Sequence, residues 1–508
     1  MRTQPALRFS FLTGVPALCL TLASGLAAAA QNPEATPEQT ITIDANAPAH
    51  DFPHFWEEMF GSGRAVLSLR ADYRKDLSLV KGITGFQYIR FHGIFDRDVG
   101  IYSQDAQGNP VYNFSYVDQI YDGLLEHGIR PFVELSFMPK PLAANPKPHP
   151  FWYHPIPSPP ADPAKWANLI HAFVQHLVDR YGKHEVEQWY FEVWNEPNID
   201  FWDGVPKQAT YFRLYNTTAR AVKSVDPKLR VGGPATAQAA WVPEFIAYCT
   251  KHHVPFDFIS THVYGNDSSE NVLGTHEPIS QRDMVARAVK KVYQQVRASA
   301  APDTPIIFSE YNATYLTQPE ITDSAFMGPW LANNIRECDG LVNMMSYWDF
   351  SDVFEEQGIV KKPFYGGYGL VAERNIPKAA FRAFELLHEL GNRRLKLADQ
   401  NALLTKRPDG TLVLALWNYA APGKTVPPKT FRLVVKNAQV TKYRMRFVDP
   451  DHGSSLKAWK QMGSPKYPSV SQIRELIAAS HMQPAQEHPI SEPVTVASQG
   501  LAVLELLP

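Results

Sequence analysis

Eight short apolar runs that resemble strands alternate with helical patterns between about residues 52 and 385. The strand-like runs are residues 55–60, 86–91, 130–135, 189–193, 229–233, 256–261, 305–309 and 342–347. Helical patterns lie between most of them, for example at residues 116–127, 162–181, 208–225, 280–298 and 323–337. Such alternation favours parallel βα units. The sequence therefore predicts an α/β fold, a (β/α)8 or TIM barrel over residues 52–390, with its chemistry at the C-terminal ends of the strands.

The pattern changes after about residue 390, where strands are joined by turn residues with no helical pattern between most of them. These strand-like runs are residues 402–405, 411–417, 430–435, 441–448 and 500–507. They predict a C-terminal antiparallel β-sandwich domain over residues 391–508. Because residues 39–44 alternate between apolar and polar, we expect the N-terminal segment 31–51 to add a strand to this sandwich. The proline-rich stretch 139–163 should form an ordered loop over the barrel mouth.

The first thirty residues have the pattern of a cleavable signal peptide. Arg2 and Arg8 precede an apolar stretch over residues 11–26, and three alanines follow at residues 28–30. This pattern predicts removal of residues 1–30 and a periplasmic or secreted protein. No other uninterrupted apolar run is long enough to span a bilayer, so we expect no membrane partner.

Charge and motif content argue against several classes of partner. The 508 residues carry 49 Lys and Arg against 51 Asp and Glu, and no long basic run indicates nucleic-acid binding. The pair His252-His253 lacks a third ligand at recognisable spacing, which favours a helix-end cation over a metal site. Gly423-Lys424-Thr425 lacks the earlier glycine of a phosphate-binding loop. We therefore expect no cofactor and no metal, and the oligomeric state stays open.

Two glutamates occupy similar places at the ends of predicted strands. Glu196 follows the run 189–193 and stands between Asn195 and Pro197, and Glu310 directly follows the run 305–309. One such glutamate is most often part of a salt bridge or a cap. Two at the strand ends of one barrel are the pair of carboxyl groups that hydrolysis of a glycosidic bond requires. The pair predicts a glycosidase.

Several further segments surround these acids in the sequence. They are Arg90-Phe91-His92-Gly93, Arg130-Pro131-Phe132-Val133-Glu134, Val231-Gly232-Gly233-Pro234, Thr261-His262-Val263-Tyr264, the run from Ser309 to Tyr315 and the run from Ser346 to Glu356. With Trp194-Asn195-Glu196-Pro197-Asn198, they make the chain resemble glycoside hydrolase family 39, whose best-known members are bacterial β-xylosidases. The resemblance covers nearly all of the chain after the predicted signal peptide. It implies a barrel with a β-sandwich, with Glu196 as acid/base and Glu310 as nucleophile.

The resemblance and the chemistry imply further roles. A retaining glycosidase needs a charged nucleophile and a protonated acid, and Tyr264 is the expected hydrogen-bond donor to Glu310. Burial near the nucleophile should raise the pKa of Glu196. Asn195 can donate to the sugar 2-hydroxyl, and Trp348 is expected to form the platform beneath the sugar.

Three further sugar-binding candidates have an ordinary structural alternative. His92 either contacts sugar or is a buried histidine with its hydrogen bonds satisfied within the protein. Glu355 and Glu356 could bind sugar hydroxyls, although one of two adjacent acids in a loop is usually solvated. Together with Trp348 and the proline-rich loop, they are expected to close the site behind one terminal sugar.

These features favour an exported retaining exo-glycosidase that releases xylose from β-1,4-xylo-oligosaccharides. Members of the same family that act on arabinosides, galactosides or glucosides remain alternatives. An α-L-iduronidase is less favoured, because Glu355 and Glu356 would repel the iduronate carboxylate. A carbohydrate-binding exoprotein without turnover would be expected to have lost one of the two acids, and both are present.

Overall fold

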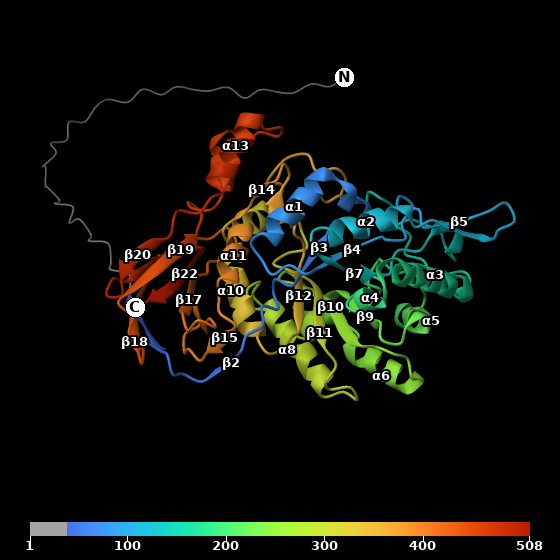
Figure 1. Cartoon of the computed structure of the whole chain (residues 1–508), viewed down its shortest axis with the longest axis horizontal. Coiled ribbons are helices and arrows are strands. Elements are labelled where there is room, and N and C mark those ends of the chain that lie inside the picture. Colours follow the sequence, from blue (N-terminus) through green and yellow to red (C-terminus); the bar gives the residue numbers. More distant parts are fainter. Residues whose placement is uncertain (1–37) are drawn as a thin grey trace, which may run out of the picture. The chain divides into compact units, whose positions relative to one another are not determined.

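Eight parallel strands close into a barrel in the computed structural model, which describes residues 38–508 (Figure 1). The strands are β3 (Met59–Ser62), β4 (Tyr88–Phe91), β7 (Arg130–Glu134), β8 (Tyr190–Glu192), β9 (Arg230–Thr236), β10 (Phe258–Tyr264), β11 (Ile306–Asn312) and β12 (Met344–Tyr347). Each pairs with the next barrel strand along the chain, and β12 pairs with β3 to close the ring. The predicted barrel is confirmed. The predicted signal peptide lies outside the described residues.

Helices connect the strands around the outside of the barrel. The longer ones are α1 (Ala71–Lys81), α2 (Ser115–Leu125), α3 (Pro163–Tyr181), α5 (Lys207–Val225), α6 (Val242–His252), α8 (Met284–Arg297), α10 (Met327–Cys338) and α11 (Ala379–His388). Single turns are η1 (Ala65–Leu69), η2 (Lys140–Leu142), α4 (Lys183–Val186), η3 (Ala237–Ala239), α7 (Ser269–Leu273) and α9 (Pro319–Thr322). Within residues 38–508, no helix is long and apolar enough to cross a membrane.

Helix α3 shows how local sequence sets these elements. Asp162 caps it by accepting a hydrogen bond from the Ala164 amide, and Pro163 occupies the first helical position, where no amide donor is needed. Its buried residues recur every three or four positions, from Trp166 to Val178, which gives one apolar face toward the barrel. The helix ends at Gly182, whose φ of 83° favours glycine.

The first barrel strand is displaced from its predicted position. The prediction was residues 55–60, but β3 begins at Met59. Phe55 and Trp56 are fully buried in a turn before the strand, where the Phe55 carbonyl accepts a hydrogen bond from the Met345 amide. An apolar run reports burial, and here the burial comes from a turn packed under the barrel rather than from strand pairing.

Two sheets pack beside the barrel as a sandwich. One contains β2 (Ala49–Asp51), β15 (Arg393–Leu395), β16 (Ala402–Lys406), β17 (Leu412–Asn418), β22 (Gly500–Leu507), β19 (Lys442–Val448) and β20 (Gln486–Pro489) in that order. The other contains β1 (Glu38–Asp44), β18 (Lys429–Lys436) and β21 (Val494–Val496). Ile41 and Ile43 of β1 share a buried core with Leu414 of β17. All pairs in these sheets are antiparallel except β1 with β18, which is parallel.

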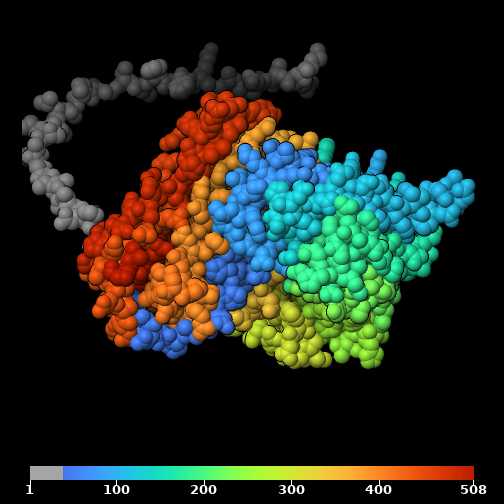
Figure 2. Space-filling model, viewed as in Figure 1, coloured from blue at the N-terminus to red at the C-terminus, as the bar shows by residue number. Residues whose placement is uncertain are grey.

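Two helices interrupt the sandwich in a region where the sequence predicted no helix between most of the strands. They are α12 (Leu456–Gln461) and α13 (Val470–Ala479), and a capping box between Ser469 and Gln472 begins the second. Trp459 and Leu476 pack against Phe364, which lies in the loop after β12. In the space-filling view the red C-terminal segment lies directly against the orange residues that follow the barrel (Figure 2). Residues 38–508 thus belong to one compact unit.

Two short hairpins complete the fold. β5 (Tyr102–Gln104) pairs with β6 (Pro110–Tyr112) beyond β4, and β13 (Val371–Ala372) pairs with β14 (Ile376–Pro377) after β12. β14 contacts α13, so this second hairpin links the loop after β12 to the C-terminal region (Figure 1).

Candidate active site

A pocket of about 670 Å³ opens at the ends of the barrel strands, and we call it the two-carboxylate pocket. Its lining consists of His92, His149, Phe151, Asn195, Glu196, Asn198, Ile199, Asp200, Phe201, Lys207, Ala237, Gln238, Tyr264, Asp267, Glu310, Tyr315, Trp348, Glu356, Gln357 and Tyr368. Every residue predicted for the site is present except Glu355. His149 and Phe151 show that the proline-rich stretch reaches this pocket.

Glu310 is held by two donors from other strands of the barrel. It lies in β11 with 4% of its surface exposed. Arg90 Nη1 donates to Glu310 Oε1 at 2.6 Å, and the Tyr264 hydroxyl donates to Oε2 at 2.6 Å. The two donors therefore fix the orientation of the Glu310 carboxyl group, as a nucleophile requires.

Arg90 is the centre of a buried charge network that the sequence reasoning missed. Its side chain is fully buried in β4 and contacts three carboxylates, those of Glu134 at 2.8 Å, Glu192 at 2.5 Å and Glu310 at 2.6 Å. It also donates to Asn195 Oδ1 at 2.9 Å. Burial alone would lower the pKa of Arg90, but the three carboxylates outweigh it and raise that pKa. The available signal was an arginine inside a strand that is otherwise apolar and aromatic.

The network also fixes Asn195. Because Arg90 occupies the amide oxygen of Asn195, the polar group left over on this side chain is an N–H donor. A donor in the pocket is what the predicted contact with a sugar hydroxyl requires.

Glu196 lies in a sharp turn after β8 rather than in the strand itself. Its backbone φ is 43°, and its amide donates to the Ala235 carbonyl at 2.7 Å. Burial, followed by the negative charges of Glu310 and Asp267, raises the pKa of Glu196 well above its usual range. The geometry therefore keeps Glu196 protonated at a pH where an ordinary glutamate is charged.

His262 connects the two acids and was also missed. It is fully buried in β10, with Nδ1 3.0 Å from Glu196 Oε1 and 3.6 Å from Glu310 Oε1. Burial, together with the positive charges of Arg90 and His92, lowers the pKa of His262 well below its usual range. A neutral imidazole can orient the Glu196 carboxyl group without drawing its proton away.

Carboxyl oxygens of Glu196 and Glu310 lie within 4.8 Å of each other. Paired carboxyl groups about 5–5.5 Å apart belong to retaining glycosidases, whereas about 6.5–9.5 Å leaves room for the attacking water of inverting enzymes. The short separation suits attack by one carboxylate and proton transfer by the other.

Within the part of the chain that the structure describes, two clusters have a spacing that could hold a metal ion. Glu196, His262 and Glu310 form one, and His54, Glu57 and His388 form the other, at the end of the barrel where the strands begin. Both Glu310 oxygens already accept hydrogen bonds from Arg90 and Tyr264. In the second cluster Glu57 Oε1 lies 2.6 Å and 2.8 Å from the two histidine Nδ1 atoms. Hydrogen bonds therefore account for both arrangements.

Trp348 and His92 form one wall of the pocket. Their ring centroids lie 4.8 Å apart, and Trp348 packs closely over the backbone of Gly61. His92 Nδ1 lies 2.7 Å from Glu134 Oε2, whereas its Nε2 lies 3.7 Å from both Glu310 Oε1 and Glu356 Oε1. Burial opposes the charged imidazolium, but Glu134 outweighs it and raises the pKa of His92. The Nε2 side faces the pocket as a hydrogen-bond donor.

The two adjacent loop acids point to different places. Glu355 does not line the two-carboxylate pocket, because its carboxylate is bound by Arg64 at 3.2 Å and Arg70 at 2.6 Å. The structure therefore differs from the expectation that Glu355 binds sugar. Glu356 does line the pocket, and burial raises its pKa to about 8 despite the opposing charge of His92. Near neutral pH it is largely an uncharged acid that can donate a hydrogen bond.

Comparisons with known proteins agree with this geometry. The family model described as "Glycosyl hydrolases family 39" matches residues 39–499. A β-xylosidase of Geobacillus stearothermophilus is 38% identical, with 87% of this chain and 89% of that protein aligned. A β-xylosidase of Caldicellulosiruptor saccharolyticus is 35% identical, with 87% and 92% aligned. The crystal structure of a monomeric β-xylosidase from Caulobacter crescentus CB15 superposes with a TM-score of 0.83 at 34% identity, covering 92% of this chain and 99% of that one.

Proposed function

The chain belongs to glycosyl hydrolases family 39, as its motifs predicted, and we propose that this glycoside hydrolase releases terminal xylose from β-1,4-xylo-oligosaccharides with retention at the anomeric carbon. The observation that carries the proposal is the separation of at most 4.8 Å between oxygens of Glu196 and Glu310. Such a separation supports double displacement rather than inversion.

The proposed mechanism has two displacements. Glu310 attacks the anomeric carbon while Glu196 gives its proton to the departing glycosidic oxygen, which leaves a glycosyl ester on Glu310. Glu196, now charged, then removes a proton from a water molecule as that water attacks the anomeric carbon and frees Glu310. The raised pKa of Glu196 and the two donors on Glu310 suit these starting states.

Xylose specificity is supported by relatives named as β-xylosidases at 38% and 35% identity. Charge repulsion by Glu355 and Glu356 does not disfavour α-L-iduronidase, contrary to the expectation from the sequence. Glu355 is paired with two arginines outside the pocket, and Glu356 is largely uncharged near neutral pH, so the two acids do not present the expected repulsion. The assignment of xylose as the terminal sugar therefore rests on the similarity to these relatives.

Action on a terminal sugar is supported by one wall of the pocket, which is built from aromatic and acidic side chains. Trp348, Glu356 and Tyr368 line it, and the Tyr368 hydroxyl is anchored by a 2.6 Å hydrogen bond to the Tyr315 carbonyl. This wall differs from the predicted one by having Tyr368 and not Glu355. We also propose export after cleavage near residue 30, on the sequence pattern of residues 1–30 alone.

The test combines a substrate panel with product stereochemistry. Initial rates would be measured on nitrophenyl β-xyloside, α-arabinoside, β-galactoside, β-glucoside and α-iduronide, with xylobiose cleavage followed by proton NMR. We expect the xyloside to be fastest and the first product to be the β-anomer. An initial α-anomer would exclude double displacement, and a much faster rate on another glycoside would replace the substrate. No turnover of any glycoside would favour a carbohydrate-binding protein.

A further inference from the structure

A second cavity of about 350 Å³ adjoins the two-carboxylate pocket, and we call it the lysine pocket. It is lined by Thr317, Phe354, Gln357, Gly358, Ile359, Val360, Lys361, Lys362, Tyr365, Tyr368 and Lys466. Gln357 and Tyr368 also line the two-carboxylate pocket, so the two cavities share a wall. Three lysines line this second cavity, and no acidic residue does.

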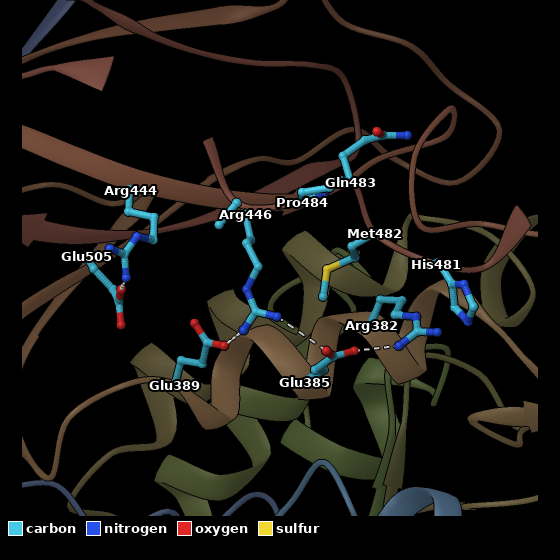
Figure 3. Close-up of a pocket in the computed structure, with 11 residues that line it drawn as sticks. Arg382, Glu385, Glu389, Arg444, Arg446, His481, Met482, Gln483, Pro484 and Glu505 are labelled. Atoms are coloured by element: carbon cyan, nitrogen blue, oxygen red, sulfur yellow. Dashed lines mark hydrogen bonds and ion pairs between the residues drawn. The ribbon is translucent and has the colours of Figure 1, made fainter. Parts of the chain in front are cut away.

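Another charged cavity of this protein shows the contrasting case. It measures about 560 Å³ and lies between α11, β19 and residues 481–485 (Figure 3). Three arginines and three glutamates line it, and each arginine contacts a glutamate. The pairs are Arg382 with Glu385, Arg446 with Glu389, and Arg444 with Glu505. Its charges cancel, so it has no surplus charge for an anionic ligand.

The lysine pocket has no such cancellation. Among residues 38–508, no carboxylate lies within ion-pair distance of Lys361, Lys362 or Lys466. The carboxylate of Asp323 feels the charge of Lys362, but it is fully buried and already bound by Lys378 at 2.7 Å. The three ammonium groups therefore leave a net positive cavity beside the site of the chemistry.

The barrel and the C-terminal region build this cavity together. Lys361 and Lys362 belong to the loop after β12, whereas Lys466 belongs to the segment between α12 and α13. Packing of Phe364 against Trp459 joins the two segments, and Lys362 Nζ lies 5.9 Å from the Trp459 ring centroid. The separate origin of the lysines makes their convergence a property of the folded protein.

We propose that the lysine pocket binds the carboxylate of a uronic acid carried by the oligosaccharide substrate. Lysines pair with carboxylates, and Tyr365, Tyr368 and Phe354 offer the aromatic surfaces that sugar rings contact. The volume lies within the range of about 300–1,000 Å³ found for small-molecule sites. This inference rests on the proposed function, since it names the substrates that the same site cleaves best: acidic xylo-oligosaccharides.

The kinetic test compares xylotriose with xylotriose that carries a glucuronic acid branch. The variant is Lys361→Ala/Lys362→Ala/Lys466→Ala, and the control is Lys251→Ala/Lys290→Ala/Lys424→Ala, which removes three exposed lysines elsewhere. We expect the unaltered protein and the control to prefer the acidic substrate about tenfold in kcat/KM, as a charge-assisted contact allows. The preference should disappear in the lysine-pocket variant and in high salt, with xylotriose cleavage unchanged. Equal rates on both substrates, or a preference that survives the triple substitution, would overturn the proposal.

A binding measurement separates this inference from the proposed function. Calorimetry on Glu310→Gln protein would measure binding of the acidic oligosaccharide, with inorganic phosphate and free glucuronate as competitors. We expect binding that depends on the three lysines and that exceeds the binding of either free anion. If no xyloside is cleaved but this binding is found, the proposed function fails and the pocket assignment stands. Equal binding with and without the lysines would overturn the assignment even if xylosides are cleaved.

Discussion

The Tyr264 hydroxyl donates a 2.6 Å hydrogen bond to Glu310 Oε2 across adjacent strands β10 and β11. Arg90 occupies the other oxygen of the same carboxylate. Both donors are distant from Glu310 in the sequence. The barrel brings the three side chains together because its strands end at one rim. This relationship makes Glu310 the more strongly held of the two acids.

Removing the Tyr264 donor should slow the reaction without unfolding the protein. A hydrogen bond to a charged group contributes about 1.5–3 kcal/mol, so Tyr264→Phe should lower kcat by about 10- to 100-fold. Steady-state kinetics and thermal unfolding would check this. Tyr311→Phe is the matched control, because the Tyr311 hydroxyl is buried in β11, the strand of Glu310, without a hydrogen-bond partner among the described residues. Equal kcat in Tyr264→Phe and the unaltered protein would contradict the assigned contact.

The pH profile should report the protonation of Glu196. The acid form is needed, so kcat/KM falls as pH rises through the raised pKa of Glu196. The charge of Asp267 contributes to that raise, and Asp267→Asn removes it. The alkaline limb should then move to lower pH. Asp303→Asn, at an exposed position, should leave the limb in place.

A shift to higher pH in Asp267→Asn would have the wrong sign for this account. Glu356 also lines the pocket with a pKa of about 8, so its titration must be separated from that of Glu196. The double variant Asp267→Asn/Glu356→Gln should still show the shift relative to Glu356→Gln alone. Absence of the shift in this pair would show that Glu196 does not set the limb, and loss of the limb in Glu356→Gln alone would assign it to Glu356.

Gly61 should be required for the position of Trp348. A Cβ atom at residue 61 would lie 2.2 Å from Trp348 Cε3, so the ring would have to move. We expect Gly61→Ala to lower kcat/KM by an amount close to that of Trp348→Ala, chiefly through KM if the ring binds sugar. Gly82→Ala, at a helix end with φ of −70°, is the control and should retain activity. Wild-type kinetics in Gly61→Ala would show that the platform does not depend on this contact.

Loss of Glu196 and loss of Glu310 should stop different steps of the reaction. Glu196→Ala should still form the glycosyl intermediate from substrates whose leaving group needs no proton, and azide should then restore turnover as a β-glycosyl azide. Glu310→Ala should lose intermediate formation on every substrate. Product analysis with and without azide would check both. Rescue confined to Glu310→Ala with the β product would reverse the assigned roles.

The sequence was sufficient for the barrel and the two acids because both leave a local pattern. The periodicity of a strand or a helix can be recognised within each segment alone, and Glu196 and Glu310 each follow an apolar run. Even so, the pattern misplaced the first strand, since burial of Phe55 and Trp56 in a turn has the same composition as a strand.

Interactions between distant segments could not be predicted from the same patterns. Glu355 and Glu356 are adjacent, and only the fold shows that Arg64 and Arg70 bind the first, 291 and 285 residues away in sequence. Arg90 and His262 stand in two of the motifs that resemble the family. Their roles could not be predicted, because their partners lie on other strands. A charged or ionisable side chain inside an apolar strand was the signal that could have identified them.

The most direct test of the central claim is the mass of the enzyme after reaction with an activated 2-deoxy-2-fluoro-β-xyloside, which slows hydrolysis of the intermediate. The account predicts one covalently attached fluoroxylosyl group, with peptide mapping placing it on Glu310. Glu310→Gln protein should not be labelled. Labelling of another residue, or prompt turnover with inverted stereochemistry and no adduct, would contradict the assignment of Glu310 as nucleophile of a retaining reaction.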